Sequence, residues 1–184
     1  MQKSTLVDFR NGRLTGQQVE ESLRTLGDLD GIFLDELAYR SMNHASVVYR
    51  VQAFQPVGNG VEGGLFWGTT FLEPGRVGDE YFMTKGHFHA KPAKAEYYVT
   101  VCGSGALILM DEGRASRVEW MTPGSVHYIP GRTAHRVANI GEETLSFLAC
   151  WPSDAGHDYA TIATQGFSAR MRCIDGRPRL VEAT

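Results

Sequence analysis

The sequence is poor in cysteine and has no long apolar run. Its 184 residues include three cysteines, Cys102, Cys150 and Cys173, and no two of them form a CxxC pair. Their odd number argues against a disulfide framework, and reduced thiols are typical of a cytoplasmic protein. Nearly apolar stretches such as residues 145–151 are far too short to span a bilayer, and the first residues lack a signal-peptide core. We therefore expect a cytoplasmic protein that does not enter a membrane.

An excess of charge of one sign is also lacking. The 18 lysines and arginines against 21 aspartates and glutamates give a net charge of −3, which offers no electrostatic basis for binding nucleic acid. Long helical patterns are few, whereas 21 glycines indicate many tight turns and hence many short strands. This combination favours an all-β protein.

One helical pattern lies near the start of the chain. Thr15 and Gln18 have the spacing of a capping box, and Val19, Leu23 and Leu26 recur at helical intervals. The pattern predicts a helix over residues 15–31, inside a short N-terminal helical extension of residues 1–45 that packs on the main domain.

From residue 46 the pattern changes to short apolar segments separated by turn residues. About nine strands are expected, at residues 46–54, 65–72, 80–89, 96–102, 106–110, 117–121, 126–130, 135–140 and 144–151. Such regular spacing suits a sandwich or a single closed jelly-roll barrel over residues 46–165. The remaining residues, 166–184, are expected to form a peripheral, partly basic tail.

Two histidines and a glutamate form a candidate metal site in this block. In a strand His87 and His89 point to the same face. A loop containing Pro92 then resets the register, so that Glu96 opens the next strand on the same face as Tyr98. One HxH pair alone more often marks ordinary histidines, but the in-phase glutamate favours metal binding.

A fourth ligand is supplied by His135, which follows a Gly-Arg-Thr-Ala turn and begins another strand. Three imidazoles and one carboxylate suit iron, zinc, manganese, nickel or cobalt better than magnesium or calcium, which prefer oxygen ligands. Such a set leaves one or two positions open for water or substrate, which is typical of a catalytic metal.

The two segments together resemble the paired motifs of the cupin superfamily. The first reads Gly86-His87-Phe88-His89 followed by Glu96, and the second runs from Gly124 through Pro130 and His135 to Asn139. Many cupins have glycine where this chain has Arg132, and most have a shorter gap before the glutamate. With those departures, residues 65–165 closely resemble the cupin-type phosphoglucose isomerases of archaea and some bacteria.

The resemblance implies a cupin jelly-roll homodimer that binds one divalent metal ion per subunit, often iron or zinc, and interconverts glucose 6-phosphate and fructose 6-phosphate. It implies the metal ligands His87, His89, Glu96 and His135. It places Thr70, Thr84 and Gly86 at the substrate phosphate and Tyr98, His157 and Tyr159 at other active-site positions. Trp151 stands where some members have a tyrosine near the phosphate, so no role is carried over to it.

Two routes for such an isomerisation stay open at this point. In an enediol route Glu96 takes the C2 proton and returns it at C1, while in a hydride shift it only moves hydroxyl protons. Tyr98 is a candidate hydrogen-bond donor or a simple packing residue, and His157 is a candidate for ring opening or an ordinary loop histidine. Lys85 is the basic residue nearest to the phosphate donors.

Two other functions fit the same motifs. A metal-dependent dioxygenase also uses three histidines and a glutamate, but it needs redox-active iron or copper and consumes oxygen. A non-catalytic sugar-binding cupin is the third reading, because the barrel alone does not dictate function. An isomerase differs from both in turning over its substrate with redox-silent zinc.

Overall fold

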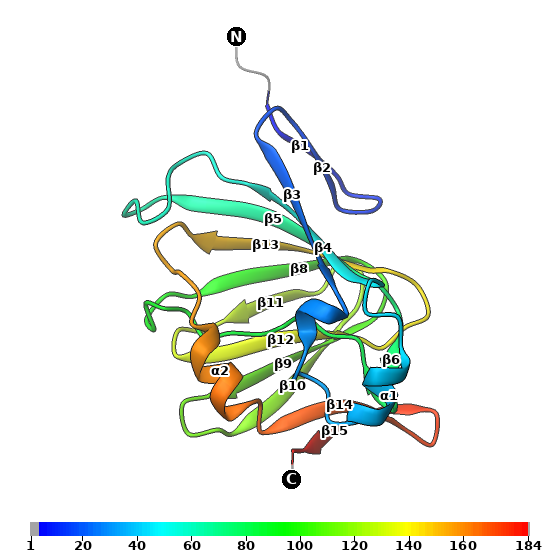
Figure 1. The fold of residues 1–184 in the computed structure, drawn as a ribbon. Coiled ribbons are helices and arrows are strands. Elements are labelled where there is room, and N and C mark those ends of the chain that lie inside the picture. Colours follow the sequence, from blue (N-terminus) through cyan, green and yellow to red (C-terminus); the bar gives the residue numbers. More distant parts are fainter. Residues whose placement is uncertain (1–3, 184) are drawn as a thin grey trace.

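The computed structural model describes residues 4–183 and is built mainly from antiparallel strands (Figure 1). A six-stranded sheet and a three-stranded sheet share one apolar core and form the barrel. In spatial order the larger sheet contains β11 (Val126–Ile129), β8 (Glu96–Cys102), β13 (Leu145–Pro152), β5 (Leu65–Leu72), β4 (Val47–Phe54) and β3 (Val19–Thr25). The smaller contains β10 (Ser116–Met121), β9 (Gly105–Asp111) and β12 (Thr133–Asn139). The prediction of an all-β protein is confirmed.

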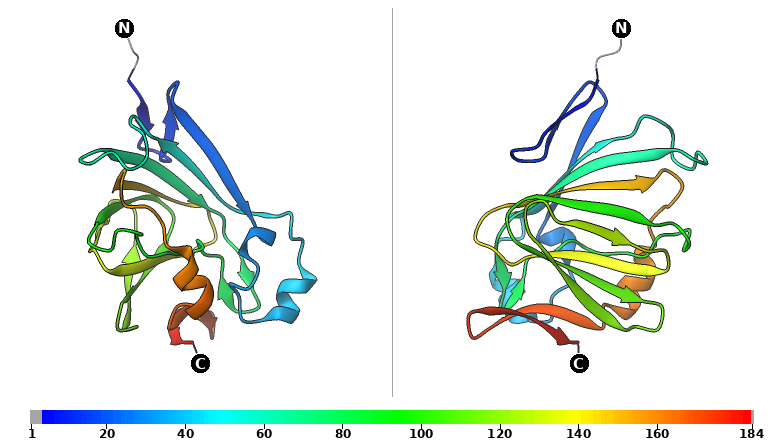
Figure 2. Two further views of the ribbon diagram at one scale, coloured as in Figure 1. Left: turned by 60° about the vertical axis from the view of Figure 1, so that its left-hand side comes forward. Right: turned by 180° about the vertical axis from the view of Figure 1, so that it is seen from behind.

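A small hairpin and a second sheet lie at the two ends of the barrel (Figures 1 and 2). The hairpin of β1 (Leu6–Asp8) and β2 (Arg13–Thr15) lies at the end marked N, and a four-stranded sheet lies at the end marked C. That sheet contains β15 (Arg177–Glu182), β14 (Ala169–Ile174), β7 (Glu80–Tyr81) and β6 (Arg76–Val77). The helices are short: η1 (Gly27–Leu29), α1 (Glu36–Ser41) and α2 (Tyr159–Gln165). Among residues 4–183, no helix has the length and apolar character needed to cross a membrane.

The helix predicted over residues 15–31 is wrong. Residues 19–25 form β3, an edge strand that pairs antiparallel with β4, from Val19 opposite Phe54 to Thr25 opposite Val47. Leu23, placed on the expected apolar stripe, is 47% exposed, whereas Leu26 beyond the strand is fully buried. Backbone pairing with β4 outweighs the helix preference of residues such as Glu20 and Leu23, because propensity is weak against tertiary context. The helices of this region are η1 and α1 instead.

The segment after residue 165 is not peripheral. β14 and β15 form a hairpin, and β14 reaches β7 through the pair Arg172 and Glu80. Met171 at the centre of β14 is fully buried in the main core. An apolar residue of that size contributes roughly 1.5–3 kcal/mol when buried, so the hairpin is held to the barrel. The division of the chain at residues 45 and 165 stays a prediction.

The strand predicted over residues 80–89 is interrupted. Only Glu80 and Tyr81 form β7, and the chain then runs beside β12 through isolated bridges, Met83 to Ala138 and His87 to His135. The extended backbone nevertheless keeps the alternation of side chains that the HxH pattern needs.

Candidate metal centre and pocket

The four predicted ligands converge at one place inside the barrel. His87 and His89 come from the extended segment after β7, Glu96 opens β8, and His135 lies in β12. The backbones of His87 and His135 are bonded to each other in both directions, at 3.3 and 3.1 Å. One ligand atom from each of the four residues lies within 4.8 Å of every other. The cluster can therefore hold a metal ion.

The hydrogen bonds of the histidines leave the correct nitrogens free for a metal. His89 donates from Nδ1 to the carbonyl of Lys94 at 2.8 Å, and His135 donates from Nδ1 to the carbonyl of Thr133 at 3.3 Å. A carbonyl only accepts, so in the neutral form of each imidazole the lone pair lies on Nε2. The Nε2 of His135 lies 2.5 Å from Oε1 of Glu96, and both atoms are buried without a hydrogen-bond partner. A divalent cation bound between these atoms would accept their lone pairs and so satisfy both buried groups.

The electrostatics of the cluster favour the protonation states that bind a metal ion. Burial alone would raise the pKa of Glu96, but the neighbouring His135 and His89 hold it well below its usual range. Burial, followed by the neighbouring His135, lowers the pKa of His87 well below its usual value. The carboxylate is thus ionised and His87 is neutral, which are the states in which these groups bind metals.

A pocket of about 270 Å³ opens beside the cluster, close to the smallest volumes that take small-molecule ligands. The structure brings all the predicted substrate residues into its wall. These residues are Thr70, Thr84, Gly86, Tyr98, His157 and Tyr159. His87, Glu96 and His135 line the same pocket, so a bound molecule would contact the metal ligands directly.

Tyr98 and His157 each lie beside one of the metal ligands. Tyr98 is buried, with its ring 5.8 Å from that of His135, and burial followed by Glu96 raises its pKa well above the usual value. Tyr98 is therefore a hydroxyl donor. The ring of His157 lies 4.4 Å from His87 and stacks on Tyr159 at 5.4 Å. Burial lowers the pKa of His157, so it is neutral near pH 7.

Sequence reasoning missed several pocket residues, two of them on β3, and left the role of Arg132 open. Ser22 and Arg24 line the pocket from β3, which the sequence predicted as a helix. Their spacing of two, which places both on one face of a strand, was the only signal for them. Arg132 lies outside the pocket wall: it is paired with Glu112 at 3.2 Å on the surface, with a left-handed φ of 60°. That backbone conformation explains why glycine is common at this position in cupins.

Trp151 lies in the pocket wall near the predicted phosphate residues. A Cβ atom at Gly68 would lie 3.0 Å from Cη2 of Trp151, so the indole covers that glycine. Trp151 also packs edge-on against Phe66, with ring centroids 5.8 Å apart. Its position is that of an apolar wall, and the structure gives it no polar contact with the predicted phosphate residues.

The loop between His89 and Glu96 is tied down by Asp154. Oδ2 of Asp154 accepts from Lys91 at 2.8 Å and pairs with Lys94 at 2.9 Å. Hydrogen bonds from Lys91 and then Lys94 lower the pKa of Asp154 to about 2. Because the carbonyl of Lys94 orients the ring of His89, this ion pair supports the metal centre from a distance.

Asp154→Asn is therefore expected to weaken metal binding by about tenfold, since outer partners of metal ligands have effects of 10- to 100-fold. Competition with a chromogenic chelator measures the affinity for Zn²⁺. Asp79→Asn is the matched control, because Asp79 pairs with Arg172 on the outer sheet and lies outside the pocket wall. Equal affinities in the two variants would show that the loop needs no such support.

A β-barrel whose interior carries three histidines and one glutamate beside a small pocket is a cupin with a candidate metal site. Among solved structures, the oxalate decarboxylase of Bacillus subtilis is similar, at a TM-score of 0.46 and 23% identity over 59% of this chain and 26% of that one. That likeness is too distant to bear on function.

The sequence comparisons are more specific. A family model described as glucose-6-phosphate isomerase (GPI) matches residues 23–182. The glucose-6-phosphate isomerase of Pyrococcus furiosus is 45% identical over 179 residues, 96% of this chain and 92% of that protein. The one from Thermococcus kodakarensis is 44% identical over 180 residues, with the same shares covered. The chain belongs to the cupin-type glucose-6-phosphate isomerase family.

Proposed function

We propose that the protein interconverts glucose 6-phosphate and fructose 6-phosphate in this pocket, with one divalent metal ion held by His87, His89, Glu96 and His135. The observation that carries the proposal is the convergence of these four side chains beside a pocket of about 270 Å³, in a chain of this family. Fe²⁺ or Zn²⁺ is the proposed ion, and Mn²⁺, Ni²⁺ or Co²⁺ fit the same ligands.

The residues around the cluster supply the proton transfers. A bound divalent ion would polarise the carbonyl oxygen of the open-chain sugar. Glu96 directs Oε1 toward His135 and His89, so Oε2 is the atom proposed to take the C2 proton and return it at C1. Tyr98 donates a hydrogen bond to a substrate oxygen. Neutral His157 accepts the proton of the anomeric hydroxyl and returns it to the ring oxygen as the bond between that oxygen and the anomeric carbon breaks. In a hydride shift Glu96 would move only hydroxyl protons.

The phosphate group is assigned to the other end of the pocket. Thr70 and Thr84 offer hydroxyl donors, Gly86 offers a backbone N–H, and Tyr159 closes the side. The ammonium group of Lys85 lies 5.3 Å from the centre of the Tyr159 ring and adds positive charge at this end. Arg24 contributes a second cation from β3.

Thr70→Val is expected to raise the KM for fructose 6-phosphate by about tenfold and to leave kcat within a factor of three. It removes one hydrogen bond to a charged group, which contributes roughly 1.5–3 kcal/mol, while keeping the shape of the side chain. Steady-state kinetics of the metal-loaded enzyme measure the separate effects on KM and kcat. Thr69→Val is the control, because its hydroxyl donates to the carbonyl of Gly12 away from the pocket. A larger effect on kcat than on KM would place Thr70 elsewhere.

A coupled assay of fructose 6-phosphate conversion tests the function itself. Turnover with redox-silent Zn²⁺ and without oxygen consumption supports the isomerase over the dioxygenase. Binding of sugar phosphate without turnover under every metal would favour the non-catalytic sugar-binding reading.

Two further properties belong to the same proposal. We expect a homodimer, with the strands of residues 46–71 at its seam, and light scattering of the purified protein tests it. The three cysteines are free among the described residues, in keeping with work in the reducing cytoplasm. Sugar phosphate is the proposed partner, and neither nucleic acid nor a membrane is part of the proposal.

A further inference from the structure

Arg136 is a buried cation directly behind the proposed phosphate end of the pocket. It follows the metal ligand His135 in β12, so its side chain points to the opposite face of the strand, away from the pocket. The residue is only 3% exposed. Its guanidinium packs on the ring of Phe167, with Cζ 4.2 Å from the ring centre. A charge placed there needs a reason, because burying a cation is costly.

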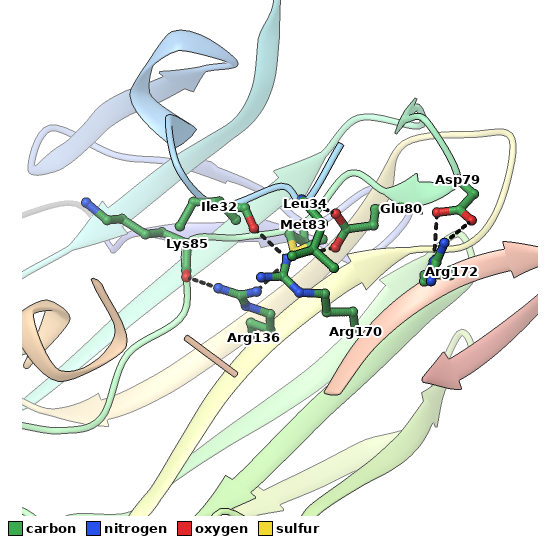
Figure 3. Close-up of polar contacts among 9 residues, drawn as sticks. All are labelled: Ile32, Leu34, Asp79, Glu80, Met83, Lys85, Arg136, Arg170 and Arg172. Carbon is green, nitrogen blue, oxygen red and sulfur yellow. Dashed lines mark hydrogen bonds and ion pairs between the residues drawn. The ribbon is translucent and has the colours of Figure 1, made fainter. Parts of the chain in front are cut away.

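No carboxylate within the described residues forms an ion pair with Arg136. The nearby Glu80 is already engaged: one oxygen accepts from Arg170 at 2.8 Å and the other from the backbone of Leu34 at 2.6 Å (Figure 3). Arg136 itself donates to the sulfur of Met83 at 3.2 Å, and its Nε has no partner. A guanidinium group stays protonated at neutral pH, so Arg136 carries a positive charge.

The strongest contact of Arg136 is with the backbone of the pocket wall. Its Nη2 donates to the carbonyl of Lys85 at 2.7 Å (Figure 3). Between the bridges Met83–Ala138 and His87–His135, residues 84–86 lie opposite only residues 136 and 137, so this segment carries one extra residue and forms a bulge that includes Lys85 and Gly86. Such bulges redirect the backbone beside functional sites, and Gly86 has the left-handed φ of 76° that they use.

Peptide geometry then fixes the direction of the next donor. The peptide between Lys85 and Gly86 is trans and planar, so the N–H of Gly86 points opposite to the carbonyl of Lys85. Since that carbonyl faces Arg136 behind the wall, the N–H faces the pocket that Lys85 and Gly86 line. No acceptor in residues 4–183 takes the hydrogen of this N–H.

The side chain of Arg136 also fills the space behind Gly86. A Cβ atom at Gly86 would lie 2.9 Å from Cβ of Arg136, 3.0 Å from its Nε and 2.7 Å from the ring of Phe167. The bulge therefore rests directly on the guanidinium, with no room for movement toward it.

We propose that Arg136 is a positioning residue for the substrate phosphate: it holds the Lys85–Gly86 peptide so that the Gly86 N–H faces the anion, and it places a buried positive charge behind that donor. This inference rests on the proposed function, which assigns the phosphate to Gly86. The inference assigns a role in phosphate binding to a cation that does not touch the substrate. It also explains why Arg136 is buried without a carboxylate partner. A buried charge is also screened little by salt.

The test is the affinity of metal-loaded protein for glucitol 6-phosphate, which has no carbonyl and cannot react, measured by calorimetry. Arg136→Met keeps the volume but loses the charge and the hydrogen bond, and its Kd is expected to rise roughly 10- to 100-fold, the effect of a hydrogen bond to a charged group. The KM for fructose 6-phosphate should rise by a similar factor while kcat changes less than threefold. Arg136→Lys keeps the charge but not the planar guanidinium group. Its Kd for glucitol 6-phosphate should lie between those of the unaltered protein and Arg136→Met.

Arg172→Met is the matched control. It removes one positive charge from the neighbouring β14, where Arg172 pairs with Asp79 at 2.6 Å outside the pocket wall, and should leave the Kd within twofold of the unaltered protein. The inference is overturned if Arg136→Met or Arg136→Lys folds, holds its metal and binds glucitol 6-phosphate as the unaltered protein does. It is also overturned if kcat falls while the Kd is unchanged. Turnover by the unaltered protein decides the proposed function separately, because the Kd ratio needs no catalysis.

Discussion

Glu96→Gln is expected to lower kcat by about 10²- to 10⁴-fold, the usual contribution of a positioned general base. The amide keeps the size of the side chain and its Oε1, which faces His135 and His89, but it cannot accept a proton at the other position. The KM for fructose 6-phosphate should change by less than about fivefold, because the phosphate end of the pocket is untouched. Initial rates in the coupled assay, normalised to bound metal, measure the effect.

Metal occupancy must be separated from proton transfer in this variant, since Glu96 is proposed for both roles. Elemental analysis of the purified protein gives the metal content, and rates are compared at equal occupancy. Glu112→Gln is a control for the change of charge, because Glu112 pairs with Arg132 on the surface. If metal-loaded Glu96→Gln turns over at the unaltered rate, Glu96 is not the base.

The isotope at C2 distinguishes the two routes that the residues leave open. Glucose 6-phosphate carrying deuterium at C2 loses it to water if Glu96 takes the proton and exchanges it. The label is retained at C1 of fructose 6-phosphate if a hydride moves directly. Retention of the deuterium would mean that Glu96 moves only hydroxyl protons. The loss in kcat expected for Glu96→Gln would then be about 10²-fold.

The metal ligands could be predicted from the sequence because their geometry is local. His87 and His89 need only an extended backbone, and Glu96 needs only a loop that resets the register before β8. The buried and exposed alternation of Glu96, Tyr97 and Tyr98 matches that expectation. His135 required more than spacing, since only the fold brings β12 beside the HxH segment. The resemblance to cupins supplied that step.

Other parts of the site depend on contacts that no local pattern encodes. β3 has both faces largely exposed, so it lacks the alternation that would identify it as a strand, and its pairing with β4 alone defines it. Ser22 and Arg24 were missed for that reason. Arg136 was visible only as a residue next to a ligand, because its burial involves Phe167, which lies far away in the sequence.

Removing the metal is the second change with a large expected effect. Protein stripped with EDTA should lose more than about 99% of its isomerase activity, because the ion is proposed to stabilise the charge that develops on the substrate oxygens. Stripping should also lower the melting temperature. An ion present at about 1,000 times its Kd stabilises the folded state by roughly 4 kcal/mol, and that contribution disappears with the ion. Thermal unfolding before and after stripping measures it.

Restoring Fe²⁺, Zn²⁺ or Mn²⁺ under argon completes this test. Activity that returns without oxygen identifies a metal-dependent isomerase and excludes the dioxygenase reading for this substrate. His135→Ala should bind the added ion weakly and regain little activity, because it removes a buried ligand atom next to Glu96. His44→Gln is the control, since His44 bonds to the carbonyl of Tyr39 outside the pocket wall and should respond like the unaltered protein. Full activity in stripped protein would instead require the residues alone to catalyse the reaction, and the convergence of three histidines on Glu96 would then have to serve stability.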